Sequence, residues 1–303
     1  MIIFVTPSRA IGIMSMSNIR MHVSSNSSLL QPEEIYYMIT INCNQRCSKC
    51  SHWKFPPYTK PRLEPYKVVD FLKAIPSCKE FIIVGGEPLL FKKEILEIIA
   101  GIKDTGIRTV IITNGFALDK AFVDAVKDYY VHFVFSIDTV DREFWKFVRG
   151  TDSYDRCMAN FEYAFQHLTG WQISIQSVLA EETLDYIPGV KKYSDEHHVS
   201  HTVQDYISEG FEGHWTPVKD KVSAIPETGQ QCYSAGRNLS ILQDGSVMTC
   251  FQQNWIEGCE APLGNLHTDK AEDILNTEYA QFVVRKMRVC NKPCKVLKCN
   301  LKK

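Results

Sequence analysis

The sequence lacks both a long hydrophobic run and an excess of charge of one sign. A membrane-spanning helix needs about 20 consecutive, mostly apolar residues, and no stretch of this chain meets that requirement. The 34 Lys and Arg residues are matched by 35 Asp and Glu, which leaves a net charge of -1. Nucleic-acid-binding domains carry a clear basic patch. We therefore expect neither a membrane nor a nucleic acid as partner.

A secretory signal is also missing. The apolar opening Met1–Thr6 is interrupted by Pro7 and Arg9 before it reaches the length of a signal-peptide core. Residues 1–33 contain many Ser, Asn and Met without helical or strand periodicity. We interpret this stretch as an irregular N-terminal arm, or as sequence upstream of a later start residue at Met14, Met16 or Met21.

The third absence is that of a disulfide framework. The chain has 11 cysteines, but disulfide-stapled proteins are short secreted domains. The cysteines of this chain gather at spacings that are typical of metal sites. We predict reduced thiols and a cytoplasmic location.

Three cysteines, Cys43, Cys47 and Cys50, lie close together after a β-branched and aromatic run. This run, Ile35–Ile41, predicts a strand whose C-terminal end carries the cysteine loop. Three thiolates at this spacing can bind three irons of a [4Fe-4S] cluster and leave the fourth iron open to another ligand. Structural zinc is the alternative, although zinc takes four ligands and only three cysteines are local.

Strands and helices alternate along the chain. The hydrophobic patterns predict strands at 35–41, 81–84, 109–112, 131–135, 172–178 and 201–206. They predict intervening helices at 65–75, 92–104, 118–128, 154–168 and 182–196. Six strands with five helices between them imply right-handed parallel crossovers. We predict an α/β fold that contains a partial (β/α)6 barrel over residues 34–207.

Residues suited to ligand binding follow three of the predicted strands. Active sites gather at the carboxyl ends of parallel barrel strands. The candidates at these ends are Gly85, Gly86, Glu87, Pro88, Thr113, Asn114, Ser136 and Asp138. Each has a structural alternative, because Gly-Gly and Asn-Gly mark turns and a Ser or Asp at a strand end can cap a helix.

The C-terminal part has a different pattern. Residues 208–231 are aperiodic and partly glycine-rich, which indicates a linker. Alternating segments about Asp244-Gly245 predict a β-hairpin within 238–249, and a helix is predicted over 269–288. The hairpin brings its flanking cysteines together, and further cysteines close the chain. The candidate metal ligands are Cys232, Cys250, Cys290, Cys294 and Cys299, for which zinc is the open alternative.

At these residues the chain resembles the radical S-adenosylmethionine (radical SAM) enzymes over about 40–210. Both the Cys-x3-Cys-x2-Cys loop and the segment Gly85–Pro88 match signatures of that family. The resemblance implies that the cluster and S-adenosylmethionine bind together, with Glu87 at the methionine ammonium. It also implies that Ser136 contacts the ribose or carboxylate and Asp138 the cofactor or substrate. The family usually has an aromatic residue where this chain has Lys49.

The family resemblance leaves the adenine contact to nearby aromatic rings. Trp53 or His52 would replace the missing aromatic residue.

The stretch 232–299 resembles the auxiliary-cluster domains called SPASM and its shorter form, twitch. Cys232 with Gly245-x4-Cys250 matches their opening motif, and Gly264-Asn265-Leu266 matches the segment before their helix. The resemblance implies a second [4Fe-4S] cluster, bound by Cys232, Cys250 and two of the last three cysteines. We expect a small α+β auxiliary-cluster domain over 232–303.

The resemblance implies radical chemistry. An electron from a reductant such as flavodoxin or ferredoxin would cleave S-adenosylmethionine to a 5'-deoxyadenosyl radical, which takes a hydrogen atom from the substrate. The auxiliary cluster could then accept an electron, giving dehydrogenation. Alternatively a thiol could return hydrogen, giving epimerisation, and Cys259 is the candidate donor. Its structural alternative is burial as a small apolar side chain.

Two observations concern the substrate. Peptide-modifying members often carry a winged-helix domain before the barrel, and the irregular arm is too short for one. Sulfatase-maturing members have Asp where this chain has Phe251. We expect a small polar substrate such as a sugar, cyclitol or aminoglycoside, with peptide modification as the alternative. A non-catalytic iron-sulfur or zinc protein is a remote third option, because it leaves Gly85–Pro88 without a function.

Overall fold

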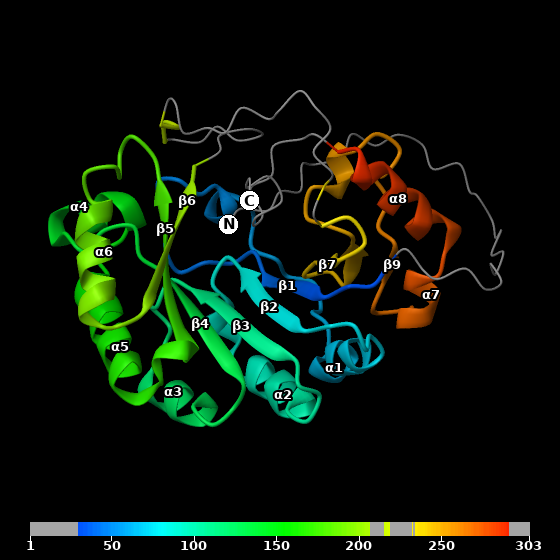
Figure 1. Ribbon diagram of the computed structural model, residues 1–303, viewed down its shortest axis with the longest axis horizontal. Coiled ribbons are helices and arrows are strands. Elements are labelled where there is room, and N and C mark those ends of the chain that lie inside the picture. The colour runs from blue at the N-terminus through cyan, green and yellow to red at the C-terminus, as the bar shows by residue number, and fades with distance from the viewer. Residues whose placement is uncertain (1–29, 207–214, 219–231, 233, 291–303) are drawn as a thin grey trace.

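The computed structural model describes residues 30–206, 215–218, 232 and 234–290. A single nine-stranded sheet passes through both halves of this part of the chain, in the order β6-β5-β4-β3-β2-β1-β7-β8-β9 (Figure 1). Neighbouring strands from β6 to β7 are parallel, whereas β7, β8 and β9 pair antiparallel. The predicted α/β architecture is confirmed.

Each predicted barrel strand is present. The barrel strands are β1 (Glu34–Thr40), β2 (Glu80–Gly85), β3 (Arg108–Thr113), β4 (Val131–Ser136), β5 (Ile173–Leu179) and β6 (Ser200–Asp205). The C-terminal strands are β7 (Asn238–Ile241), β8 (Ser246–Met248) and β9 (Gly264–Asn265). The predicted hairpin about Asp244-Gly245 is therefore confirmed as β7 and β8.

Helices connect the parallel strands β1 to β6. They are α1 (Pro65–Lys73), α2 (Lys92–Ile102), α3 (Lys120–Val126), α4 (Arg142–Arg149), α5 (Tyr154–His167) and α6 (Ile187–Glu196). Two more helices, α7 (Ala271–Leu275) and α8 (Glu278–Arg288), follow β9. Single 3-10 turns are η1 (His52–Lys54), η2 (Pro88–Phe91), η3 (Gly170–Gln172) and η4 (Gln253–Trp255). Among the described residues, no helix is long and apolar enough to cross a membrane.

Two helix predictions were wrong. The structure has a helix, α4, between β4 and α5 that the sequence pattern did not reveal; Asp141 caps it by accepting from the Phe144 amide at 2.7 Å. The single helix predicted over 269–288 is two helices, α7 and α8. Thr277 lies at the break, where its hydroxyl accepts from the Ala280 amide at 3.0 Å and starts α8.

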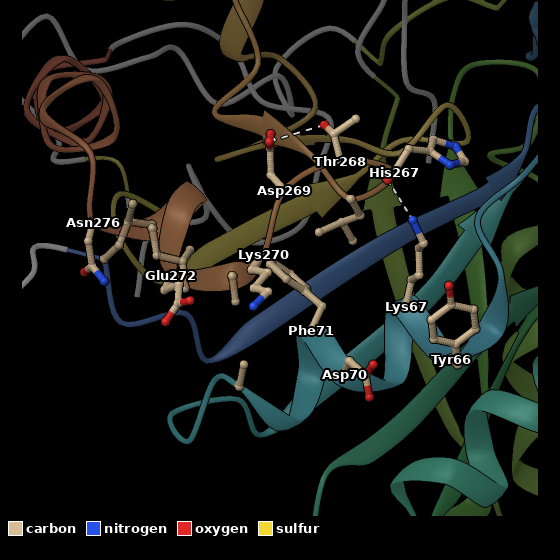
Figure 2. Close-up of a pocket in the computed structure, with 15 residues that line it drawn as sticks. Tyr66, Lys67, Asp70, Phe71, His267, Thr268, Asp269, Lys270, Glu272 and Asn276 are labelled. Carbon is tan, nitrogen blue, oxygen red and sulfur yellow. Dashed lines mark hydrogen bonds between the residues drawn. The ribbon is translucent and has the colours of Figure 1, made fainter. Parts of the chain in front are cut away.

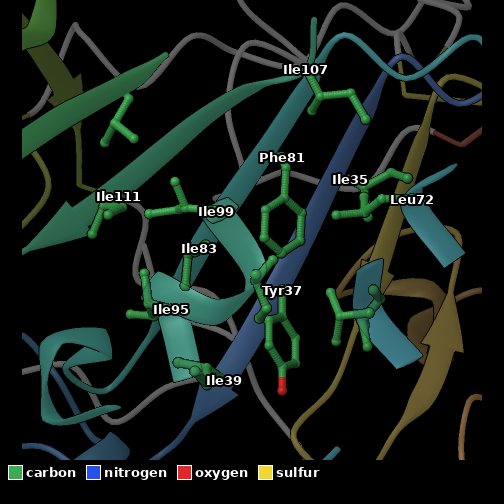
Figure 3. Close-up of a cluster of buried hydrophobic side chains, with 14 of the residues drawn as sticks. Ile35, Tyr37, Ile39, Leu72, Phe81, Ile83, Ile95, Ile99, Ile107 and Ile111 are labelled. Carbon is green, nitrogen blue, oxygen red and sulfur yellow. The ribbon is translucent and has the colours of Figure 1, made fainter. Parts of the chain in front are cut away.

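The two faces of the sheet have separate apolar cores. Ile35, Tyr37 and Phe81 pack against α1 and α2 with other buried side chains (Figure 3). The alternate residues of the same strands, including Tyr36 and Met38, form a second cluster with Phe251 from the C-terminal part. This alternation is the period-2 pattern of a sheet buried on both sides.

The C-terminal part is joined to the barrel through the sheet. Strand β7 pairs in parallel with β1, and the amide of Ile41 donates to the Gln243 side chain at 2.8 Å. Leu30 is buried, and the amide of Gln31 donates to Gly236 at 2.8 Å. Residues 30–33, predicted as part of an irregular arm, are therefore tied to the start of β7. The rest of that arm and most of the predicted linker lie outside the described residues.

Candidate functional site

The site begins with the cysteine loop that leaves the carboxyl end of β1. Cys43, Cys47 and Cys50 are half-buried and form no disulfide. The amide of Cys50 donates to Cys47 at 3.0 Å, and the amide of Gln45 donates to the Cys43 sulfur at 3.4 Å. Burial raises the pKa of the Cys43 thiol to about 12 and that of Cys50 to about 11. Binding of iron to these thiols would release protons.

Helix α4 holds the loop from the other side. The amide of Arg46 donates to Arg149 at 3.0 Å, and the amide of Ser48 donates to Val148 at 3.1 Å. Gly150 ends α4 with a φ of 62°, and a Cβ there would lie 2.1 Å from the Arg46 carbonyl oxygen. Only glycine permits this approach, so the end of α4 is fitted to the cysteine loop.

Gly85 and Gly86 permit a similar close approach at the end of β2. A Cβ on Gly85 would lie 2.2 Å from the Thr40 oxygen, and one on Gly86 would lie 2.2 Å from the Asn42 oxygen. The amide of Gly86 donates to Thr40 at 2.7 Å. The missing side chains therefore bring β2 against the segment that leads into the cysteine loop, which is a structural reason for both glycines.

Glu87 is completely buried directly after these glycines. Its carboxylate accepts from the Thr113 hydroxyl at 2.7 Å, the Asn114 amide at 2.8 Å and the Leu89 amide at 3.0 Å. Burial raises the pKa of Glu87 to about 7, although these three hydrogen bonds act in the opposite direction. Pro88, the last predicted residue of this segment, is buried at the start of η2.

The end of β3 joins Glu87 to the cysteine loop. Thr113 and Asn114 are buried, and the Asn114 side-chain amide donates to the Cys43 sulfur at 3.7 Å and to Asn44 at 2.9 Å. Residues from β1, β2 and β3 that the sequence singled out are thus brought into one connected set of contacts.

The end of β4 carries a buried charge cluster that the sequence did not reveal. Both carboxylate oxygens of Asp138 lie 2.6 Å from the Lys49 ammonium, and one lies 3.2 Å from the Arg149 guanidinium. Although burial by itself raises the pKa of Asp138, the two cations hold it below its usual value. Arg149 also donates to the main-chain carbonyl of Ser136, whose side chain is half-buried.

The aromatic residues near the loop have definite positions. The Trp53 indole donates to the Cys47 carbonyl at 3.1 Å, and His52 is buried in η1. Trp215, from the segment after β6, is buried and donates to the Ser48 hydroxyl at 2.8 Å. Its ring lies 5.1 Å from the Lys49 ammonium. No local sequence signal pointed to Trp215, because its partners are distant in the chain.

The candidate auxiliary ligands are only partly described. Cys250 follows β8, Cys232 precedes β7, and Cys290 follows α8, all of them half-buried. Cys294 and Cys299 lie outside the described residues. Cys259 has no exposed surface and belongs to the main hydrophobic core. Burial raises the pKa of its thiol, and the nearby Glu260 carboxylate acts in the same direction.

The donor set of the first loop fits an iron-sulfur cluster. Within the described ranges, no three Cys, His, Asp or Glu side chains converge tightly enough to bind one metal ion. A four-iron cluster attaches each thiolate to a different iron, so its ligands need not meet at one point. Three thiols on a single loop beside buried polar groups meet that requirement.

Comparisons with known proteins agree with this geometry. Residues 37–198 match the radical SAM superfamily, and residues 232–300 match the SPASM iron-sulfur cluster-binding domain. Because the first match covers more than half of the chain, the protein belongs to the radical SAM superfamily. S-adenosylmethionine, a [4Fe-4S] cluster and a SPASM auxiliary cluster are its cofactors.

Individual relatives are distant. The chain is 30% identical over 172 residues to a GTP 3',8-cyclase of Haemophilus influenzae (strain PittEE), a match that covers 52% of this chain and 50% of the cyclase. The chain thus spans about half the length of that curated relative.

Solved structures share the fold. Streptococcus suis SuiB bound to precursor peptide SuiA superimposes with a TM-score of 0.69 at 15% identity, over 87% of this chain and 72% of SuiB. BtrN in complex with AdoMet and 2-DOIA gives a TM-score of 0.55 at 12% identity, over 90% of this chain and 96% of BtrN.

A separate cavity lies between α1 and the segment around α7. It has a volume of about 670 Å³, and the Lys67 ammonium donates to the His267 carbonyl at 2.7 Å beside it (Figure 2). None of the residues predicted to bind a cluster or S-adenosylmethionine lines this cavity.

Proposed function

We propose that this radical SAM enzyme takes a hydrogen atom from a small polar substrate, such as a sugar, cyclitol or aminoglycoside, and dehydrogenates it. The observation that carries the proposal is the chain of contacts from the cysteine loop through Asn114 to Glu87. These residues leave three different strands at the same edge of the sheet, where barrel enzymes bind their substrates.

In this proposal Cys43, Cys47 and Cys50 hold the cluster that, when reduced, supplies the electron for cleavage of S-adenosylmethionine. Glu87 accepts a charge-assisted hydrogen bond from the methionine ammonium. The Asn114 amide and the Thr113 hydroxyl orient its carboxylate for this contact. Gly85 and Gly86 keep the site compact by letting β2 approach the loop.

Ser136 and Asp138 complete the proposed cofactor side of the site. The half-buried Ser136 hydroxyl is assigned to the ribose or carboxylate of S-adenosylmethionine. Asp138 is already engaged by Lys49 and Arg149, so its contribution is to hold these two cations in place. Trp53 or His52 would contact the adenine.

The choice of dehydrogenation over epimerisation rests on Cys259. A hydrogen-atom donor must touch the substrate radical, and Cys259 is buried within the main hydrophobic core. Glu87 is buried as well, but among polar groups that are joined to the cysteine loop. The second cluster, assigned to Cys232, Cys250 and two of Cys290, Cys294 and Cys299, would instead accept the second electron.

The substrate assignment rests on Phe251. This residue packs against Tyr36 at a ring distance of 5.9 Å, within the apolar cluster on the inner face of the sheet. Sulfatase-maturing members of the family have Asp at this position, and this chain lacks that carboxylate. Peptide modification is the competing proposal, since SuiB, which has been solved bound to a precursor peptide, shares the fold.

A low-potential protein such as flavodoxin or ferredoxin would supply the electron. The proposed ligands must be thiolates to bind iron, which fits a reducing, cytoplasmic setting.

Anaerobic reconstitution tests the proposal. Two four-iron clusters predict about eight irons and eight sulfides per chain, with formation of 5'-deoxyadenosine on addition of reductant and S-adenosylmethionine. The triple variant Cys43→Ala, Cys47→Ala, Cys50→Ala should lose about half of the iron and all cleavage. Cys78→Ala, a buried cysteine on the turn before β2, is the matched control and should lose neither.

One equivalent of zinc with only about four irons per chain would contradict the assignment of a second iron-sulfur cluster. Substrate discovery by mass spectrometry then separates the two substrate proposals, because a modified peptide and an oxidised small molecule differ in mass change and size.

A further inference from the structure

We propose that Arg149 is a positioning residue that raises the reduction potential of the cluster bound by the Cys43–Cys50 loop, by donating to the Cys47 thiolate. The inference rests on the proposed function, since it assumes that this loop holds a cluster.

The guanidinium of Arg149 is fixed beside the loop. Its side chain is 3% exposed, and one terminal nitrogen lies 3.9 Å from the Cys47 sulfur. The other terminal nitrogen pairs with Asp138 and donates to the Ser136 carbonyl. The group lies 5.2 Å from the centre of the Trp145 ring, which packs against its face. Contacts on several sides leave little freedom to turn away from Cys47.

One donor of this buried cation is unsatisfied. The Nε atom of Arg149 is buried and has no hydrogen-bond partner among the described residues. Burying a charged group without its full set of partners is costly. The orphaned N-H therefore indicates that the guanidinium is built to face a further negative group at this place, beyond Asp138.

The charges around Arg149 do not cancel. Asp138 carries one negative charge, and it is shared between the Lys49 ammonium and the Arg149 guanidinium. The cluster of three charged side chains thus keeps one net positive charge, and Arg149 is the member that contacts the cysteine loop. The positive charge of Arg149 also acts to lower the pKa of Glu87, although burial has the larger, opposite effect.

A fixed cation at this position has a redox consequence. Reduction adds one electron from a low-potential one-electron donor, without forming or breaking a bond, and makes the site one unit more negative. A buried positive charge next to a ligand sulfur stabilises the more negative state, and hydrogen bonds to cluster sulfurs act in the same direction. Arg149 should therefore make the cluster easier to reduce.

The test is a redox titration followed by the electron paramagnetic resonance signal of the reduced cluster. Every protein carries Cys232→Ala and Cys250→Ala, so that a single cluster is observed. Arg149→Gln should lower the equilibrium constant for one-electron reduction of the cluster at least tenfold, which corresponds to a decrease of about 59 mV in its reduction potential. Arg149→Lys, which keeps the charge, should give a smaller shift. The matched control is Arg142→Gln, an exposed arginine on the same helix, which should not shift the potential.

The outcomes are separable. Full iron content with an unchanged potential in Arg149→Gln would overturn the inference but leave the proposed function intact. Failure of the parent protein to bind iron at the loop would instead overturn the proposed function. If Arg149→Gln does not assemble a cluster, Arg149→Lys decides. It keeps the positive charge but removes the guanidinium that contacts Cys47, and a potential equal to that of Arg142→Gln would refute the proposal.

Discussion

Glu87 is an ionisable residue that is completely buried. Burial raises its pKa to about 7, so its carboxyl is partly protonated at neutral pH. A raised folded-state pKa means that its contribution to stability is present below about pH 4.5 and is lost as the pH rises through about 7. In the proposed function the same group must be ionised to pair with the methionine ammonium, so folding and cofactor binding would favour opposite protonation states.

The first prediction concerns the pH dependence of cofactor binding. The affinity for S-adenosylmethionine should increase as the pH rises through about 7, because Glu87 must lose a proton to form the ion pair. Glu87→Gln should weaken binding at pH 8 by about 1.5–3 kcal/mol, roughly tenfold to a hundredfold, and flatten the pH profile. Anaerobic calorimetric titration measures both effects.

The exposed Glu97→Gln on α2 is the control for Glu87. A wild-type affinity that does not change between pH 6 and pH 8 would contradict the proposed role of Glu87.

The second prediction concerns Cys259, whose burial argues for a packing role. Cys259→Ala should leave formation of 5'-deoxyadenosine and product unchanged. It should lower the free energy of unfolding by about 1 kcal/mol, because a small buried side chain is truncated. Product analysis in deuterated water and thermal unfolding are the measurements. Loss of an epimerised product, together with solvent deuterium in the wild-type product, would restore the donor role.

At the scale of elements, the contact between α4 and the cysteine loop determines the position of the loop. The loop has no regular structure of its own between β1 and η1. Its main chain is held by the last residues of α4 and by the two glycines at the end of β2. The arrangement therefore depends on two glycine-permitted close approaches, one from each side.

The third prediction compares two glycines with left-handed backbone. Gly150 has a φ of 62° and no room for a Cβ, whereas Gly106 has a φ of 75° and nothing within 4 Å. Gly106→Ala should lower the free energy of unfolding by about 1–2 kcal/mol through backbone strain alone. Gly150→Ala should cost more and also reduce the iron bound by the loop.

Urea unfolding and iron analysis measure these two effects of the glycine substitutions. Equal losses of stability, with full iron in both variants, would show that the contact with Arg46 is unimportant.

At the scale of the whole molecule, the sheet makes the C-terminal part a structural neighbour of the barrel. Strand β7 covers the edge of β1, and Phe251 covers Tyr36 on the inner face. The auxiliary-cluster segment thus protects the strand that carries the first cysteine loop. An exposed edge strand with apolar neighbours promotes aggregation.

The fourth prediction separates this structural role from the redox role. Deletion of residues 232–303 should give a protein that aggregates and fails to cleave S-adenosylmethionine, because β1 loses its partner strand. Cys232→Ala with Cys250→Ala keeps the strand pairing, so 5'-deoxyadenosine should still form while oxidised product is lost. Light scattering and product analysis distinguish the two proteins. A soluble, fully active truncated barrel would contradict the structural role.

The sequence by itself determined the elements and the cysteine loop. Strand periodicity and helical periodicity are local, so β1 to β6, the hairpin and most helices could be predicted from runs of neighbouring residues. The spacing of Cys43, Cys47 and Cys50 is local as well, and the parallel topology then placed Glu87, Thr113 and Asn114 at the same edge. Helix α4 was not predicted, because its eight residues make only about two turns, which is short for recognition by periodicity.

The tertiary structure decided how those residues are used. Lys49 and Asp138 are 89 residues apart in the chain, and Arg149 meets both only after β4 and α4 have folded around the loop. The pairing of β7 with β1, the close approach at Gly150 and the burial of Cys259 likewise involve residues distant in the sequence. No pattern of neighbouring residues encodes such contacts, because they arise from the packing of elements that each form for local reasons.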